Sequence, residues 1–197
     1  DIAHPEVAQA LADRLTGDDD ELRLAATESL ARIGNMLGGL PEDVIEKLLD
    51  ILEQGDARLR LGAVRALGTS ASKFAVSALP AYLEDPDCLV RAEAITTLAK
   101  LGETGPWPAS LLIDPDPPVR LAAAKAIAEA TEPDRVERLV DFAFSFAGHH
   151  CRATAGLLRA FDADAASRAF CDVLEDQTRV REWPVAIEAL GELNGPQ

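Results

Sequence analysis

A short residue pattern recurs four times along the chain and restricts its fold more than any other feature. Each copy has an Asp four residues before an Arg, an Ala three residues after that Arg, and an aliphatic residue seven after it. The Asp and Arg residues are Asp19 and Arg23, Asp56 and Arg60, Asp87 and Arg91, and Asp116 and Arg120. Offsets of 0, 3 and 7 share one face of an α-helix. Each copy therefore predicts a helix, here called a second helix, that begins near its Asp and buries this face.

Another apolar, helix-compatible stretch precedes each second helix. These predicted first helices cover residues 5–16, 42–53, 72–84, 108–113, 133–147 and 163–175. Successive repeat arginines are 37, 31 and 29 residues apart, which suits a two-helix unit with loops of variable length. Pro80 and Pro184 fall inside predicted helices and are expected to kink them. Gly34, Gly68 and Gly102 are expected to end second helices in a left-handed conformation.

The last two units follow the pattern less closely. Arg152 and Arg181 begin helices whose apolar residues fit only if the arginine is shifted by one position. Terminal repeats of such arrays commonly diverge. We therefore predict an all-α fold, an α-α superhelix (solenoid) of about six helical hairpins in one domain over residues 1–197. The approximate repeats are 5–34, 41–70, 72–102, 106–130, 133–161 and 163–193.

The pattern resembles the HEAT repeat family, especially the short HEAT-like repeats of the phycobilisome-lyase subgroup. The resemblance rests on second helices that read Val/Leu-Arg-x-x-Ala-x-x-x-Leu after an Asp, as at Leu22-Arg23 and Val90-Arg91. It covers residues 5–130 clearly and nearly all the rest weakly. The resemblance implies stacked hairpins whose second helices line a concave side, and it is almost silent about activity.

The composition limits the kinds of partner. A net charge of −15 gives a field that repels phosphate backbones and anionic lipids, so neither nucleic acid nor a membrane is expected as a partner. Trp107 and Trp183 are too few and too scattered to suggest a groove that reads DNA bases. No apolar run approaches the ~20 residues that cross a bilayer. The three cysteines are widely spaced, which does not suggest a disulfide framework and favours a cytoplasmic location.

The repeated Asp and Arg residues could form a catalytic or anion-binding array, but we interpret them as a structural ladder. Each Asp is placed where it can accept hydrogen bonds from the first N–H groups of a helix. Each Arg lies on a buried face and needs a carboxylate as its partner.

The helix face opposite the buried stripe is the candidate partner-binding surface. It comprises the positions five and nine residues after each repeat Arg. These positions are Glu28, Arg32, Arg65, Thr69, Thr96, Lys100, Lys125 and Glu129. Their basic members form a positive stripe in an acidic protein and would suit an acidic or extended peptide. The alternative is an ordinary solvated helix face with charged neighbours at i, i+4.

No catalytic site, metal site or cofactor is predicted. His149, His150 and Cys151 have ligand chemistry, but adjacent residues on a helix point about 100° apart and do not chelate. Di-iron hydroxylases with HEAT-like repeats carry His-Glu pairs, and this chain has no His-Glu dipeptide. A chromophore-handling or lyase role remains an alternative, because Cys88, Cys151 or Cys171 could react with a chromophore.

Three phenylalanines crowd one predicted first helix. Phe142, Phe144 and Phe146 stand among aliphatic residues, which makes the helix apolar nearly all round. Packing on several sides explains this, and the alternative is an exposed surface for self-association. The sequence as a whole predicts a non-catalytic scaffold for another protein or peptide, with a self-assembling structural module as a further alternative.

Overall fold

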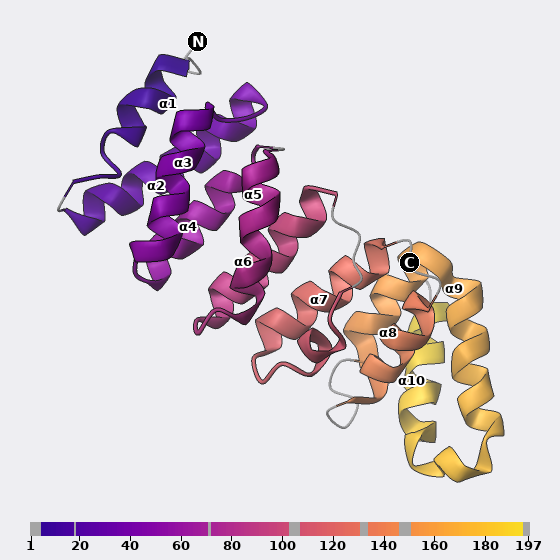
Figure 1. The fold of residues 1–197 in the computed structure, drawn as a ribbon. Helices are drawn as coiled ribbons and strands as arrows, with labels where there is room; N and C mark the ends of the chain where they lie inside the picture. Colours follow the sequence, from indigo (N-terminus) through magenta and orange to yellow (C-terminus); the bar gives the residue numbers. More distant parts are fainter. Residues whose placement is uncertain are drawn as a thin grey trace. The chain divides into compact units, whose positions relative to one another are not determined.

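The computed structural model describes residues 5–17, 19–70, 72–102, 107–130, 134–145 and 151–194. In these ranges the chain forms α-helices and short 3-10 helices and no strands, so the predicted all-α class is confirmed (Figure 1). None of the described helices is both long and apolar enough to pass through a bilayer. The chain divides into two compact units, Asp1–Glu103 and Thr104–Gln197. The single domain expected over the whole chain stays a prediction.

The first unit contains three consecutive helical hairpins. Its elements are α1 (Pro5–Ala12), α2 (Asp20–Leu37), α3 (Glu42–Gln54), α4 (Ala57–Leu67), α5 (Lys73–Ala78), the 3-10 helix η1 (Leu79–Glu84) and α6 (Cys88–Lys100). The second helices α2, α4 and α6 pack against one another in sequence, and the first helices α1, α3 and α5 do the same (Figure 1). The unit therefore has two layers, one of first helices and one of second helices.

The second unit begins with a short first helix, as the sequence predicts. Its elements are η2 (Ala109–Ile113), α7 (Pro117–Glu129), α8 (Arg135–Phe144), α9 (Cys151–Glu175), the 3-10 helix η4 (Gln177–Glu182) and α10 (Trp183–Asn194). Non-helical dihedral angles at Asp162 (φ −159°, ψ 73°) divide α9 into two parts. The second part matches the predicted first helix 163–175, and the Ala165 N–H donates to Asp162 Oδ1 at 3.0 Å near its start.

The repeated apolar positions form the core of the hairpins. The alanines are Ala26, Ala63, Ala94 and Ala123, and the aliphatic residues are Leu30, Leu67, Leu98 and Ile127; all are buried. Each buried Leu or Ile side chain contributes about 1.5–3 kcal/mol relative to an exposed one. The small alanines let neighbouring helices approach closely.

Two contacts between glycine and threonine mark the close approach of α2 to α4 and to Thr69, which follows α4. A Cβ atom added to Gly62 would lie 2.5 Å from Thr27 Oγ1, and one added to Gly34 would also collide with Thr69 Oγ1. Gly68, just after α4, faces Thr97 of α6 in the same way, at 2.8 Å from Thr97 Cγ2. A Cβ atom at a distance below 3.0 Å would force its neighbour to shift. The second helices therefore approach one another at glycines.

The contact of Gly34 with Thr69 explains why the predicted end of α2 at Gly34 is wrong. Gly34 lies inside α2, which continues to Leu37 and ends at Gly38 in a left-handed conformation (φ 73°). Gly34 serves the contact with the neighbouring helix and does not end its own. Gly68 follows α4 with a right-handed φ of −65°, and Gly102 has the expected positive φ of 88°.

The two prolines inside predicted helices behave differently. Pro80 lies in η1, where the first helix changes from α to 3-10 geometry after Ala78. The prediction that Pro184 kinks a helix is wrong, because α10 begins at Trp183 and the proline lies in its first turn. A proline there removes no helical hydrogen bond.

Candidate partner-binding groove

The repeat aspartates mainly cap their helices. Asp19 accepts hydrogen bonds at the start of α2, Asp56 does so for α4 and Asp87 for α6. The Asp116 side chain makes no cap bond to α7, whose first two residues are prolines without an N–H.

The repeat arginines share one role that the sequence did not indicate. Each guanidinium donates to backbone carbonyls of the segment that precedes its own helix. The acceptors are Leu15 for Arg23, Gly55 for Arg60, Asp85 and Pro86 for Arg91, and Asp114 and Pro115 for Arg120. These bonds tie each second helix to the loop that leads into it.

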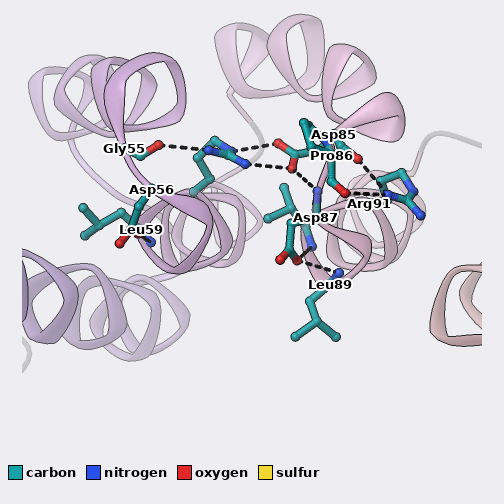
Figure 2. A network of polar contacts seen from close by, with 10 residues as sticks. Gly55, Asp56, Leu59, Asp85, Pro86, Asp87, Leu89 and Arg91 are labelled. Carbon is teal, nitrogen blue, oxygen red and sulfur yellow. Dashed lines mark hydrogen bonds and ion pairs between the residues drawn. The ribbon is translucent and has the colours of Figure 1, made fainter. Parts of the chain in front are cut away.

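The ion pair of Arg60 joins two repeats. Its Nε and Nη2 donate to the two carboxylate oxygens of Asp85 at 2.8 and 2.9 Å, and the Asp85 side chain is 3% exposed. Figure 2 shows Asp85, Gly55 and Arg91 in this network of polar contacts. Burial by itself would raise the pKa of the Asp85 carboxyl, but the bonds from Arg60 and from the Asp87 N–H outweigh it and lower the pKa. The arginine of one hairpin therefore pairs with the loop acid of the next, and not with its own cap, Asp56.

Sequence reasoning missed Asp85 because it considered only the capping acids. The available signal was the triplet Asp-Pro-Asp, which occurs at residues 85–87 and again at 114–116. In both triplets the N–H of the second Asp donates to Oδ1 of the first, at 2.8 and 2.9 Å. The first repeat lacks this arrangement, and Arg23 instead pairs with the exposed Asp20 at 3.0 Å.

The second helices of the first unit line a groove of about 280 Å³. Its walls and floor are Ala31, Arg32, Asn35, Arg65, Gly68, Thr69, Glu93, Thr97 and Lys100. We call this set the α2–α4–α6 groove. The structure thus brings together four of the predicted binding residues, which are Arg32, Arg65, Thr69 and Lys100.

The other predicted residues lie elsewhere. Glu28 and Thr96 are not part of the groove lining, and Thr96 Oγ1 donates to the carbonyl of Ala92 at 2.9 Å. Lys125 and Glu129 are exposed on α7 in the second unit. Glu93 and Asn35 line the groove although the sequence pattern did not select them.

The groove carries an excess of positive charge. Arg65 Nε donates to Glu93 Oε2 at 3.0 Å, and the Glu93 side chain is 19% exposed against 51% for Arg65. Arg32 donates only a long bond of 3.3 Å to Ser29 Oγ, and Lys100 is exposed. Neither Arg32 nor Lys100 forms an ion pair with any residue that the structure describes. Three cations against one carboxylate leave this surface positive in a chain of net charge −15.

The second unit contains two of the three cysteines, Cys151 and Cys171. Cys151 is buried, and its Sγ donates to the Val185 carbonyl at 3.3 Å. Burial and the nearby carboxylates raise the pKa of Cys151 to about 11, which keeps the thiol neutral. Cys171 is exposed and lies on a groove of about 920 Å³ between α8 and α9. His149 and His150 lie outside the described residues.

Acidic side chains are common in this part of the chain, but those that the structure describes do not gather into a metal site. Across the residues that the structure describes, no group of three His, Cys, Asp or Glu side chains could hold a metal ion.

The phenylalanines of α8 are packed inside the second unit. Phe142 is 2% exposed. Phe144 meets the edge of Phe170 at a centroid distance of 5.8 Å, and the Arg179 guanidinium lies 5.2 Å from the Phe144 ring. Contacts on several sides therefore account for these two residues, while Phe146 lies outside the described part of the chain.

Comparisons with known proteins agree with the repeat architecture. A family model of HEAT repeats matches residues 45–110. No curated protein matches the sequence. Similar solved structures include an engineered protein, with 22% identity and a TM-score of 0.52 over 95% of this chain and 96% of that one. They also include a designed armadillo repeat protein, with 16% identity and a TM-score of 0.51 over 94% and 99%. These two similarities show a solenoid of helical repeats.

A third solved structure scores lower. It is the complex of CpcE and CpcF of phycocyanin lyase from Nostoc sp., with 22% identity and a TM-score of 0.47 over 96% of this chain and 94% of that one.

Proposed function

We propose that this chain is a non-catalytic scaffold that binds another protein or peptide along its second helices. The match of residues 45–110 to a model of HEAT repeats supports this proposal. The observation that supports this most directly is the charge of the α2–α4–α6 groove. Arg32, Arg65 and Lys100 face a single acid, Glu93, in a chain whose net charge is strongly negative. A positive surface in such a chain is suited to an acidic partner.

The packing beneath the groove supports binding without a large ordering cost. Arg32, Arg65 and Lys100 project from three helices that approach one another at glycines, and Arg60 and Asp85 join two of the hairpins. Residues on such packed helices are already positioned before the partner arrives. Preformed surfaces lose less conformational entropy on binding, so weak contacts over several repeats can sum to useful affinity.

We further propose that Lys125 and Glu129 on α7 take part in partner binding within the second unit. Lys125 and Glu129 occupy the same offsets in their repeat as Arg65 and Thr69 in theirs, and both are exposed. The free thiols of Cys88, Cys151 and Cys171 support a reducing, cytoplasmic setting.

The alternatives have less support from the described residues. A chromophore-attaching role needs a reactive thiolate, and Cys151 has a raised pKa, so only a more exposed thiol such as Cys171 could supply it. Self-assembly through the α8 phenylalanines would need exposed rings, whereas Phe142 is buried and Phe144 packs against Phe170.

The scaffold hypothesis is tested by charge reversal. In affinity capture with crosslinking from the source cells, the variants Arg65→Glu, Lys100→Glu and Lys125→Glu are expected to lose a partner that the unaltered chain retains. Lys73→Glu on α5 is the matched control, because it reverses an exposed charge on a first helix. Capture that is equal for all variants would remove the second-helix surface as the binding site.

A further inference from the structure

We propose that the groove between α8 and the second part of α9 binds a segment of a partner protein that is rich in lysine and arginine. The groove lies between the first helices of two successive repeats in the second unit. It is therefore a different surface from the α2–α4–α6 groove and is suited to a partner of the opposite charge. We call it the α8–α9 groove.

Two adjoining cavities make up the α8–α9 groove. The larger has a volume of about 920 Å³ and the smaller about 300 Å³, and Glu137, Ala169 and Asp172 line both. The smaller cavity continues toward the ends of the two helices, where it reaches Asp141 and Asp176. Cavities of about 300–1,000 Å³ are typical of binding sites. The groove therefore has room for several side chains of a partner.

Carboxylates outnumber guanidinium groups along the groove. The acids of the two linings are Glu137, Asp141, Asp162, Asp172, Glu175 and Asp176, and the arginines are Arg135, Arg168 and Arg179. Six acids against three arginines leave the lining with a net charge of −3. Such a surface attracts cationic side chains and repels acidic ones.

Three of these acids make no hydrogen bond or ion pair through their side chains with any residue that the structure describes. They are Glu137 on the α8 wall and Asp172 and Glu175 on the α9 wall. The other three have partners within the chain. Asp162 and Asp176 accept hydrogen bonds from the helices that follow them, and Asp141 lies 3.9 Å from an arginine nitrogen. The unpaired acids are the groups left for a ligand.

The arginines of the groove do not neutralise these three acids. Arg179 donates to Glu182 at 2.9 Å and lies beside an aromatic ring. Arg135 donates to the Ala130 carbonyl at 2.7 Å. Arg168 is exposed, and neither it nor Arg135 forms an ion pair with a residue of the described ranges. The charge of the unpaired acids is therefore available to a cationic partner.

The position of the acids opposes the stability of their own helices. Asp172 and Glu175 lie in the last turn of α9 and Asp141 in the last turn of α8, and neither turn contains a basic residue. The C-terminal end of a helix carries a partial negative charge, so a carboxylate there is unfavourable and a cation is favourable. Residues that oppose local stability are characteristic of functional sites. A cationic segment in the groove would remove this repulsion.

The lining between the charged walls favours long cationic side chains over a compact inorganic cation. Val136, Ala165 and Ala169 line the larger cavity. Lysine and arginine have aliphatic stems that cover apolar surface while the charged end reaches an acid. Alanines beside two acidic walls leave space for such stems.

The test measures the fluorescence anisotropy of labelled hexalysine at about 150 mM salt, where distant charges are screened. The double variant Glu137→Gln and Asp172→Asn removes one acid from each wall and is expected to weaken binding about tenfold. The matched control is Asp134→Asn with Asp164→Asn, which changes the net charge equally at exposed positions outside the groove. It should weaken binding about twofold or less. Equal losses would show binding by net charge alone and would overturn the proposal.

A second variant fills the groove without a change of charge. Ala169→Leu places a larger side chain where the two cavities meet and should weaken hexalysine binding about fivefold or more. Circular dichroism checks that the helices are intact, and Cys171→Leu in the larger cavity replaces this variant if they are not. Unchanged binding by a folded variant would overturn the groove as the site.

The thermal stability of the free protein separates a binding role of the acids from a structural one. Asp172→Asn with Glu175→Gln should raise the unfolding temperature, because it removes two carboxylates from a helix C-terminus. A lower unfolding temperature would assign these acids to the fold and would overturn the proposal.

Two further measurements identify the kind of ligand and the surface. Tighter binding of spermine than of hexalysine would indicate a free polyamine and would overturn the partner protein. Arg65→Glu and Lys100→Glu should leave hexalysine binding within about twofold, because they belong to the other groove. If these two variants lose the cellular partner while hexalysine does not bind, the scaffold function stands and the α8–α9 site is wrong.

Discussion

Arg60 and Asp85 meet through two hydrogen bonds of 2.8 and 2.9 Å that connect a second helix to the loop of the following hairpin. The Arg60 side chain is 19% exposed and that of Asp85 is 3% exposed. Arg60 also donates to the Gly55 carbonyl behind it. One guanidinium therefore holds both the loop before α4 and the loop before α6.

Removal of the Asp85 carboxylate should destabilise the protein strongly. Asp85→Ala leaves Arg60 without its partner in a largely buried position, and breaking a buried pair in this way costs about 3–5 kcal/mol. Urea denaturation followed by circular dichroism measures the change. Asp20→Ala, which breaks the exposed pair with Arg23, is the control and should cost less than about 1 kcal/mol. Similar losses in both variants would contradict the role of the buried pair.

The same carboxylate should make stability depend on acid. Asp85 has a lowered pKa in the folded state, so its contribution is fully present above the unfolded pKa of about 3.9. The contribution is lost as the pH falls from there through the lower native pKa. The difference in unfolding free energy between the unaltered protein and Asp85→Asn should therefore shrink below about pH 4. A difference that is constant between pH 6 and pH 2.5 would count against the pKa shift.

A methyl group at the crossing of α2 and α4 should be costly. Gly62→Ala would place its Cβ 2.5 Å from Thr27 Oγ1, and overpacking of this kind costs about 1–3 kcal/mol. Thr27→Ala in the same chain should recover part of the loss, because it removes the obstructing hydroxyl. Thermal unfolding of the single and double variants measures both effects.

The control for this experiment is a helical glycine that meets nothing. Gly191 lies within α10, and a Cβ there would have no neighbour within 4 Å. Gly191→Ala should stabilise by about 0.5–1 kcal/mol through the better helix propensity of alanine. An equally tolerated Gly62→Ala would show that α2 and α4 can move apart.

The three cysteines should differ in reactivity. Cys171 is exposed and should be the first to be alkylated by iodoacetamide at pH 8. Cys151 is buried and has a pKa of about 11, so it should react only after unfolding. Mass spectrometry of peptides at successive times measures the order. Fast modification of Cys151 in the folded protein would contradict its burial and would revive the chromophore-attaching alternative.

The spacing of the repeat residues along the sequence was sufficient to predict the hairpins, because the Arg, Ala and Leu positions lie on one helix face and indicate which side is buried. It could not predict Asp85 as the partner of Arg60, since the two residues are 25 positions apart and belong to different hairpins. Gly34 was misread for a related reason. A glycine that ends a helix and a glycine that meets a neighbouring helix look alike in one sequence, and only the position of Thr69 distinguishes them.

The candidate site was predicted only in part, for a similar physical reason. Offsets five and nine selected Arg32, Arg65, Thr69 and Lys100, because outward positions follow from helix periodicity. Glu93 lies in the middle of α6 and reaches Arg65 only because α4 and α6 are packed together. Contacts between helices depend on how the helices cross, which a single repeat does not encode.

The glycines that meet threonines on the next helix also limit how these hairpins can be exchanged. Gly62 of α4 accommodates Thr27 of α2, and Gly34 of α2 accommodates Thr69, which follows α4, so each partner comes from the neighbouring hairpin. A hairpin transplanted into another array, or duplicated within this one, would meet a neighbour without the matching gap. Evolutionary gain or loss of repeats here would therefore require paired substitutions on both sides of the new junction.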